Sequence, residues 1–137
     1  MPVNILETDQ WCLLLPPEWV AGRDDDIVHI RDRDDVGELE ITTLCRDDGT
    51  IGLDEVKAMA AQESPEVSEW QPANFGGFVG VGGHFLEDGA AISEWYVAQQ
   101  GVLLYITYLC DEEDAGMDMP AVLEMLSTLV LGDSSAK

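Results

Sequence analysis

The chain has few basic residues. Its 137 residues contain 6 lysines and arginines and 28 aspartates and glutamates, which gives a formal net charge of -22 at pH 7. Between Ala58 and Ala136 there is no lysine or arginine. Nucleic-acid affinity rests on basic side chains that neutralise phosphates, and anionic membranes attract basic segments. The composition therefore excludes nucleic acid and membranes as partners. It leaves two interpretations of the acidic surface: a face that steers a basic partner, or an adaptation for solubility or high salt.

Long apolar runs and a secretion signal are also absent from the sequence. No apolar run approaches the roughly 20 residues that span a membrane, and the first residues lack the basic and apolar regions of a signal peptide. The three cysteines, Cys12, Cys45 and Cys110, lie within or at the end of apolar runs, with no CxxC pair and no metal-ligand spacing. Reduced core cysteines are typical of cytosolic proteins. We therefore expect a cytoplasmic protein, and one disulfide with an odd thiol stays open.

What the sequence does contain is organised around residues 78–110. Three apolar runs are separated there by two short turn signals, Asp88-Gly89 and Gln100-Gly101. An Asp-Gly pair suits a tight hairpin, because glycine accepts a positive φ. The pattern predicts a three-stranded antiparallel meander. Its last run, residues 102–110, is apolar on both faces of the strand. This predicts a central strand that is covered on both faces.

Further elements are predicted around this meander. Apolar patterns predict strands over 11–15, 27–31 and 38–45. Helical periodicity predicts helices over 53–63 and 120–131. The strand at 38–45 is expected near the edge of the sheet, because glutamates alternate with its Leu39 and Ile41. Pro72 favours an edge or an irregular crossing for the segment at 66–75, because proline cannot donate to a strand ladder.

These elements predict one α+β domain over residues 1–137. Its core spans about 10–131, and the ends, 1–9 and 133–137, are expected to be flexible. The predicted fold is an α/β/α sandwich in which two main helices cover a mostly antiparallel, twisted sheet of about six strands.

The glycine-rich segment at 76–84 carries no nucleotide-binding fingerprint. Phe85 stands where such a fingerprint needs glycine, and the segment enters a strand instead of a helix. In strand register Gly80 and Gly82 share one face with Phe78 and His84, so this face is locally bare. Bare backbone either lets a helix pack closely or leaves a shallow groove.

No catalytic residue, cofactor site or metal site is assigned from the sequence. The acidic run at 32–37 departs from a calcium loop, because Val36 is at its fifth position and Thr43 at its twelfth. His29 and His84 each lie within a strand without a nucleophile or ligand at a partnering spacing, which favours a structural role. Carboxylates are so numerous that no acid/base pair can be singled out.

Aromatic residues give the best candidates for a recognition surface. The four tryptophans, Trp11, Trp19, Trp70 and Trp95, either fill the core or line a hydrophobic groove. The predicted partner-binding residues are Trp19, Trp70, Phe78, Gly80, Gly82, His84, Trp95 and Tyr96.

The order of elements resembles the PsbP-like α/β/α sandwich. The resemblance is carried by the strand and Pro-Pro-Glu-Trp turn at 11–19, the helix at 53–63, the glycine-rich strand through His84, and the run from Tyr96 to Tyr108 before a closing helix. Mog-type Ran-binding factors, DcrB-type proteins and the effector-associated (Eag) chaperones of type VI secretion share this fold. The resemblance implies a binding module such as an adaptor, chaperone or assembly factor, assigns no subfamily and transfers no catalytic residue.

We therefore expect a non-enzymatic module that binds another protein. The resemblance gives a sharper form, a chaperone for hydrophobic helices of a secreted effector, and the acidity favours a basic partner; a homodimer stays open. The alternative is a small-molecule-binding or catalytic domain that uses His84 with nearby carboxylates. A deep, enclosed pocket around His84 would favour the alternative, and an open, shallow face would favour protein binding.

Overall fold

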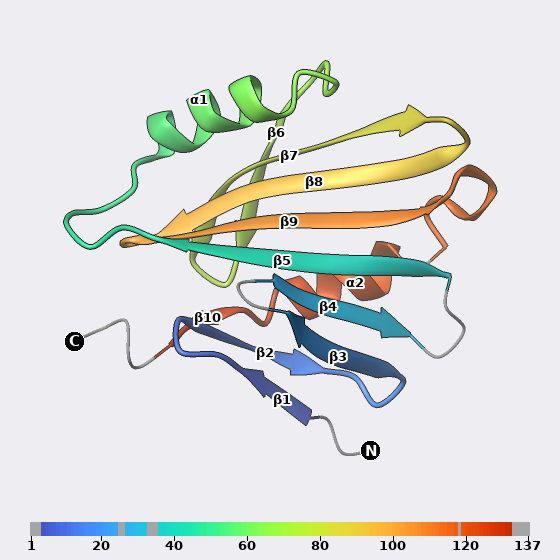
Figure 1. Cartoon of the computed structure of the whole chain (residues 1–137), viewed down its shortest axis with the longest axis horizontal. Coiled ribbons are helices and arrows are strands. Elements are labelled where there is room, and N and C mark those ends of the chain that lie inside the picture. The colour runs from blue at the N-terminus through green and yellow to red at the C-terminus, as the bar shows by residue number, and fades with distance from the viewer. Residues whose placement is uncertain (1–3, 25–26, 33–35, 118, 133–137) are drawn as a thin grey trace.

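The computed structural model describes residues 4–24, 27–32, 36–117 and 119–132. These residues form two antiparallel sheets and two α-helices (Figure 1). The strands are β1 (Asn4–Glu7), β2 (Trp11–Leu15), β3 (Trp19–Asp24), β4 (Ile27–Asp32), β5 (Gly37–Cys45), β6 (Gln71–Phe75), β7 (Phe78–Glu87), β8 (Ala90–Gln99), β9 (Val102–Asp111) and β10 (Val130–Leu131). The helices are α1 (Leu53–Glu63) and α2 (Met119–Leu126), with a short 3-10 turn, η1 (Glu112–Asp114).

The predicted meander forms three adjacent strands of a 7-stranded sheet with the order β3-β4-β5-β9-β8-β7-β6, and its last strand, β9, is the middle strand of the sheet. Its first turn places Asp88 at φ 53° and Gly89 at φ 84°, and its second places Gln100 at φ 54°. Positive φ values at these positions match the right-handed twist of the flanking strands. Both predicted hairpins of the meander, and the predicted helix at 53–63, are confirmed.

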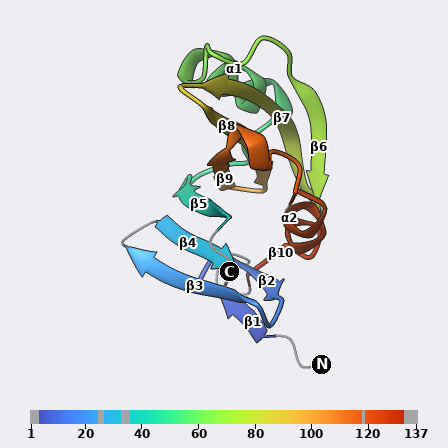
Figure 2. The same cartoon turned by 90° about the vertical axis from the view of Figure 1, so that its right-hand side faces the viewer.

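The two faces of the main sheet pack against different elements. Side chains alternate between the faces along each strand. On the inner face, residues such as Ile30, Ile41 and Ile106 pack against β2 and α2 in one large core. On the outer face, α1 packs its Val56 and Ala60 in a smaller cluster. Figure 2 shows α2 and the small sheet on one side of the main sheet, and α1 on the other.

The prediction that β9 is covered on both faces is only partly right. On the outer face Leu103 is 1% exposed, but Leu109 at the other end of the strand is 49% exposed. The reason is length: the 11 residues of α1 span about 16 Å, whereas the 10 residues of β9 span about 33 Å. The helix therefore covers one half of the outer face and leaves the other half open.

The 3-stranded sheet has the order β1-β2-β10 and joins the two ends of the chain. The sequence predicts a flexible lead over 1–9, but residues 4–7 form β1 and pair with β2. The sequence also predicts a helix up to Leu131, but α2 ends at Leu126 and Val130 pairs with Cys12. Thr128 N and Leu129 N donate to the carbonyls three residues earlier, at 3.1 and 3.0 Å, and these bonds tighten the turn and redirect the chain. The predicted flexible end at 133–137 lies outside the described residues.

Two strands occupy other positions than the sequence pattern indicates. The strand predicted near an edge, β5, is interior and pairs with both β4 and β9. Its Glu38 and Glu40 stay half-exposed because they lie on the open half of the outer face. Pro72 does lie in an edge strand, β6, as expected. The strands β1, β3 and β10 were not predicted. The predicted strand β2 pairs with β1 and β10 in a separate sheet, and the main sheet has seven strands where about six were expected.

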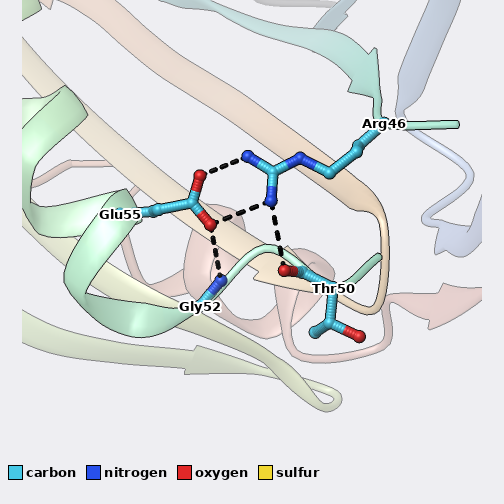
Figure 3. Close-up of polar contacts among 4 residues, drawn as sticks. All are labelled: Arg46, Thr50, Gly52 and Glu55. Atoms are coloured by element: carbon cyan, nitrogen blue, oxygen red, sulfur yellow. Dashed lines mark hydrogen bonds and ion pairs between the residues drawn. The ribbon is translucent and has the colours of Figure 1, made fainter. Parts of the chain in front are cut away.

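A polar network fixes the start of α1 against the end of β5 (Figure 3). The guanidinium of Arg46 forms a two-fold contact with the carboxylate of Glu55, and its Nη1 also donates to the carbonyl of Thr50 at 3.2 Å. Glu55 Oε1 accepts from the backbone N-H of Gly52 at 3.4 Å. The hydrogen bond from Arg46 lowers the pKa of Glu55, and the Gly52 amide adds to this.

In the part of the chain that the structure describes, no helix is long and apolar enough to cross a membrane.

Candidate functional site

A groove of about 490 Å³ lies between the inner face of the main sheet and α2. Small side chains create it. Ala91 and Ser93 of β8 pair with Cys110 and Tyr108 of β9, and they keep the floor low where the rest of the inner face carries large apolar residues. The walls include Met119 and Leu123 of α2 on one side and His84 and Leu86 of β7 on the other, with Ser68 and Glu69 at the rim.

One rim of the groove is a strand edge. The ladder between β6 and β7 ends at the pair Gln71 and Gly82. Among the described residues, those at 83–87 of β7 therefore pair with β8 only, and Figure 1 shows the β7-β8 hairpin extending past β6. An exposed edge presents N-H and C=O groups that an additional strand can pair with.

The structure brings three of the eight predicted partner-binding residues to this groove. They are Gly82, His84 and Trp95. Trp19 and Phe78 belong to the inner core and are buried. Trp70 and Tyr96 lie on the outer face beside α1, where their rings meet edge to face at 5.8 Å. Gly80 lies inside the ladder and lines no part of the groove.

The glycine face is closely packed at its centre. A Cβ added to Gly82 would lie 2.3 Å from Cδ1 of Trp95. A Cβ added to Gly80 would lie 1.8 Å from the carbonyl oxygen of Tyr96. The indole of Trp95 and the backbone of β8 therefore take up the space that glycine leaves. The atoms nearest to a Cβ at either position belong to β8, so the close packing of a helix, one of the two interpretations of the bare face, is not what fills it. Gly82 also lines the groove, as the other interpretation expected.

His84 lines the groove but has no catalytic arrangement around it. It is exposed, and within the described ranges its ring makes no ion pair with a carboxylate. The acidic residue that shares the groove lining with it is Glu69, at the rim. Among the described residues no hydrogen bond joins His84 to a carboxylate, so the pair that the catalytic alternative expects is not formed there.

A buried polar cluster that the sequence analysis missed lies on the outer face. Glu94 is 6% exposed, and its Oε2 accepts a hydrogen bond of 2.8 Å from the hydroxyl of Tyr105. Its Oε1 is buried and has no hydrogen-bond partner among the residues described. Next to it, the hydroxyls of Tyr96 and Ser64 are 2.8 Å apart. Burial, and then the Glu94 carboxylate, raise the pKa of Tyr105. Burial also raises the pKa of Tyr96.

The substitution Tyr105→Phe is expected to lower the free energy of unfolding by about 2 kcal/mol at neutral pH, because Glu94 would stay buried without its hydrogen bond. It should also change the response to alkali. The pKa of Tyr105 is raised above its ordinary value of 10.0, so the unfolded chain releases this proton first. Its contribution to stability is therefore complete below about pH 10 and is lost as the pH rises further. Urea unfolding of wild type and variant at about pH 8 and pH 11 measures both effects.

Glu94→Gln is the matched control for this prediction, since the amide oxygen still accepts from Tyr105 and the charge is removed. We expect it to unfold at the same urea concentration as wild type or a higher one. An alkaline slope that is equally steep in wild type and in Tyr105→Phe would contradict the assigned role of Tyr105.

This chain is similar to known proteins in its fold and not in its sequence. No protein-family model and no curated protein sequence matches it. Among solved structures, a crystal structure from Bacteroides thetaiotaomicron VPI-5482 is similar with a TM-score of 0.68 and 14% identity, over 91% of this chain and 46% of that one. The solution structure of cyanobacterial PsbP (CyanoP) from Synechocystis sp. PCC 6803 is similar with a TM-score of 0.61 and 13% identity, over 94% and 92% of the two chains. This chain thus spans about half of the Bacteroides protein, and it has a PsbP-like α+β fold.

Proposed function

We propose that this PsbP-like chain is a non-enzymatic, cytoplasmic module that binds another protein in the groove between β7, β8 and α2. The observation that carries the proposal is the meeting of an apolar groove with the unpaired edge of β7 at residues 83–87. Together they offer backbone hydrogen bonds and a place for side chains, which is how proteins add a strand from a partner. The occupant is therefore an extended segment in which apolar residues alternate with polar ones.

The acidic residues around the groove favour a basic partner segment. Glu69 lies at the rim of the groove and Glu87 ends the exposed edge of β7. The chain between Ala58 and Ala136 supplies no lysine or arginine to offset them. Lysine or arginine at the alternate positions of the segment would face these carboxylates and accelerate association. A second copy of this chain would bring the same negative charge to the edge, which opposes a homodimer through this surface.

The resemblance to effector-associated chaperones supports a sharper form of the proposal. A chaperone covers apolar segments of its client before the client reaches its destination. The open strand edge favours an extended client segment over the hydrophobic helices that the resemblance alone implies. An adaptor that holds such a segment permanently uses the same groove.

A peptide of about eight residues that alternates valine and lysine is the direct probe of this function. We expect it to bind in fluorescence anisotropy, to weaken as salt rises to about 0.5 M, and to protect the amides of residues 83–87 from hydrogen exchange. Ala91→Trp, which fills the groove floor, should weaken binding at least about tenfold. Val20→Trp is the matched control, because Val20 is 63% exposed on β3, outside the groove.

The specificity controls are a peptide with glutamate in place of lysine and one with the valines and lysines in two separate blocks. Neither should protect the β7 edge. Equal binding of the alternating peptide to wild type and Ala91→Trp would overturn the proposal, and so would protection elsewhere on the chain. If the protein binds the alternating peptide, a salt-titrated pull-down from the native host identifies the natural partner. The Ala91→Trp variant, used as bait in a parallel pull-down, is the control.

A further inference from the structure

Three potential metal ligands meet on the open half of the outer face, away from the groove. Nδ1 of His29 lies 2.9 Å from Oε2 of Glu38 and 3.3 Å from Oε2 of Glu40. All three ligand atoms lie within 4.8 Å of one another. The side chains are 32%, 38% and 39% exposed, so an ion can reach them from solvent.

Strand register fixes this arrangement. His29 on β4 is directly opposite Glu40 on β5. Glu38 is two residues earlier on β5, and a spacing of two places it on the same face as Glu40. Because β5 is paired on both sides, the backbone that carries the two glutamates is held firmly. Rigid elements of this kind hold ligands closer to a productive geometry than loops do.

The distances agree with a shared metal ion. An ion about 2.1 Å from each ligand atom separates neighbouring ligands by roughly 3.0 to 3.4 Å in octahedral or tetrahedral geometry. The two separations from His29 are close to this range without rearrangement. One imidazole nitrogen and two carboxylates favour a borderline divalent ion such as Zn²⁺ or Co²⁺ over Mg²⁺ or Ca²⁺, which prefer oxygen ligands alone. The two carboxylates also balance the charge of such an ion.

The surroundings leave room for the rest of the coordination shell. Gly22 of β3 is opposite His29 on its other side, and no heavy atom lies within 4 Å of the place where a Cβ would be. Water can therefore occupy the remaining positions of the ion. Arg31 is opposite Glu38 in the ladder, but no ion pair joins a lysine or arginine to either glutamate within the described ranges. Among the described residues, no lysine or arginine therefore neutralises these carboxylates.

We propose that His29, Glu38 and Glu40 bind one divalent transition-metal ion, with water completing its coordination. Three protein ligands and open positions are typical of sites that act on, or bind, a further ligand, whereas closed structural zinc sites use four protein ligands. The site is independent of the groove, since it lies on the other face of the sheet and shares no residue with the groove lining.

Cobalt titration of the whole chain tests the proposal. We would add Co²⁺ in the presence of about 5 mM Mg²⁺, which occupies the many exposed carboxylates, and follow the visible absorption of the bound ion. The expected result is saturation at one equivalent, loss of the absorption when Zn²⁺ is added, and a higher melting temperature with Zn²⁺. His29→Gln should abolish the signal, and Glu40→Gln should weaken binding at least about tenfold.

His84→Gln is the matched control, because it removes the other histidine and should leave the titration unchanged. Circular dichroism establishes that each variant is folded. If His29→Gln does not fold, Glu40→Gln decides the question alone. Binding that does not saturate, or that is equally tight in the folded variants, would overturn the proposal. In that case the short distances reflect a direct contact of the His29 ring with the two glutamates.

Discussion

Gly80→Ala is expected to lower the free energy of unfolding by about 3 kcal/mol or more, which is at the upper end for overpacking. The added Cβ would lie 1.8 Å from the carbonyl oxygen of Tyr96 and 2.9 Å from the Cα of Val97. Both atoms belong to the backbone of β8, so no side-chain rotation relieves the clash. The strands β7 and β8 would have to separate within the main sheet, next to the edge strand β6. Since small domains are stable by only about 5 to 15 kcal/mol, this change removes a large share of the total.

Gly22→Ala provides the matched control within the same sheet. A Cβ on Gly22 meets no heavy atom within 4 Å, and its φ is not positive. Alanine there should be neutral or slightly stabilising, because it restricts the unfolded chain. Urea unfolding followed by tryptophan fluorescence measures both variants. Equal midpoints for Gly80→Ala and Gly22→Ala would refute the assigned contact between Gly80 and β8.

Trp11→Ala is expected to cost about 3 to 5 kcal/mol, which is typical of truncating a buried aromatic residue. The indole is 0% exposed in the inner core. Its Nε1 donates a hydrogen bond of 2.8 Å to Oγ1 of Thr43 on β5. Trp11 is thus a residue of the small sheet that is both packed and hydrogen-bonded to the main sheet. The substitution leaves a cavity between the two sheets and also removes the donor that Thr43 accepts from.

Two further variants separate these contributions. Trp11→Phe keeps most of the apolar volume and loses the hydrogen bond, so it should cost less than the alanine variant, about 1 to 2 kcal/mol. Leu14→Ala on the same strand is the surface control, because Leu14 is 42% exposed, and it should cost less than about 1 kcal/mol. Denaturation midpoints rank the three. A Trp11→Ala midpoint close to that of Leu14→Ala would show that the two sheets do not depend on this contact.

The parts of the fold that the sequence predicts are those with local causes. The meander follows from turn residues that accept positive φ, as Asp88, Gly89 and Gln100 do. The helix at 53–63 follows from its periodicity. The parts that were missed have distant causes. Two residues, Val130 and Leu131, carry too little pattern to predict a strand, and they become one only because β2 offers them an edge.

The interior position of β5 could not be read from its alternating pattern. An alternating pattern indicates that one face of the strand is half exposed. The same pattern occurs in edge strands and in interior strands, so it does not distinguish them. Glu38 and Glu40 are half-exposed because α1 is too short to cover them, and they are not at an edge. The extent of a covering helix is a tertiary property, and no residue of β5 encodes it.

The candidate sites show the same limit. Gly82, His84 and Trp95 lie together because they share one face of neighbouring strands. Trp95 and Tyr96 are consecutive residues of one strand, so alternation places them on opposite faces, and the sequence itself argues against a surface that contains both. The approach of His29 to Glu40 depends on the register of a hairpin. The separation of nine positions between His29 and Glu38 does not reveal that register, so this cluster was not found from spacing.

The pairing of β2 with both β1 and β10 affects how the chain matures during translation. Leu14 N donates to the hydroxyl of Thr128, a residue 114 positions later. When a ribosome makes this protein, β2 emerges early and must wait for almost all of the remaining residues before its second neighbour exists. Contacts of such long sequence separation slow folding. The core around the apolar side chains of β2, Trp11 among them, is consequently completed only when the last part of the chain has been made.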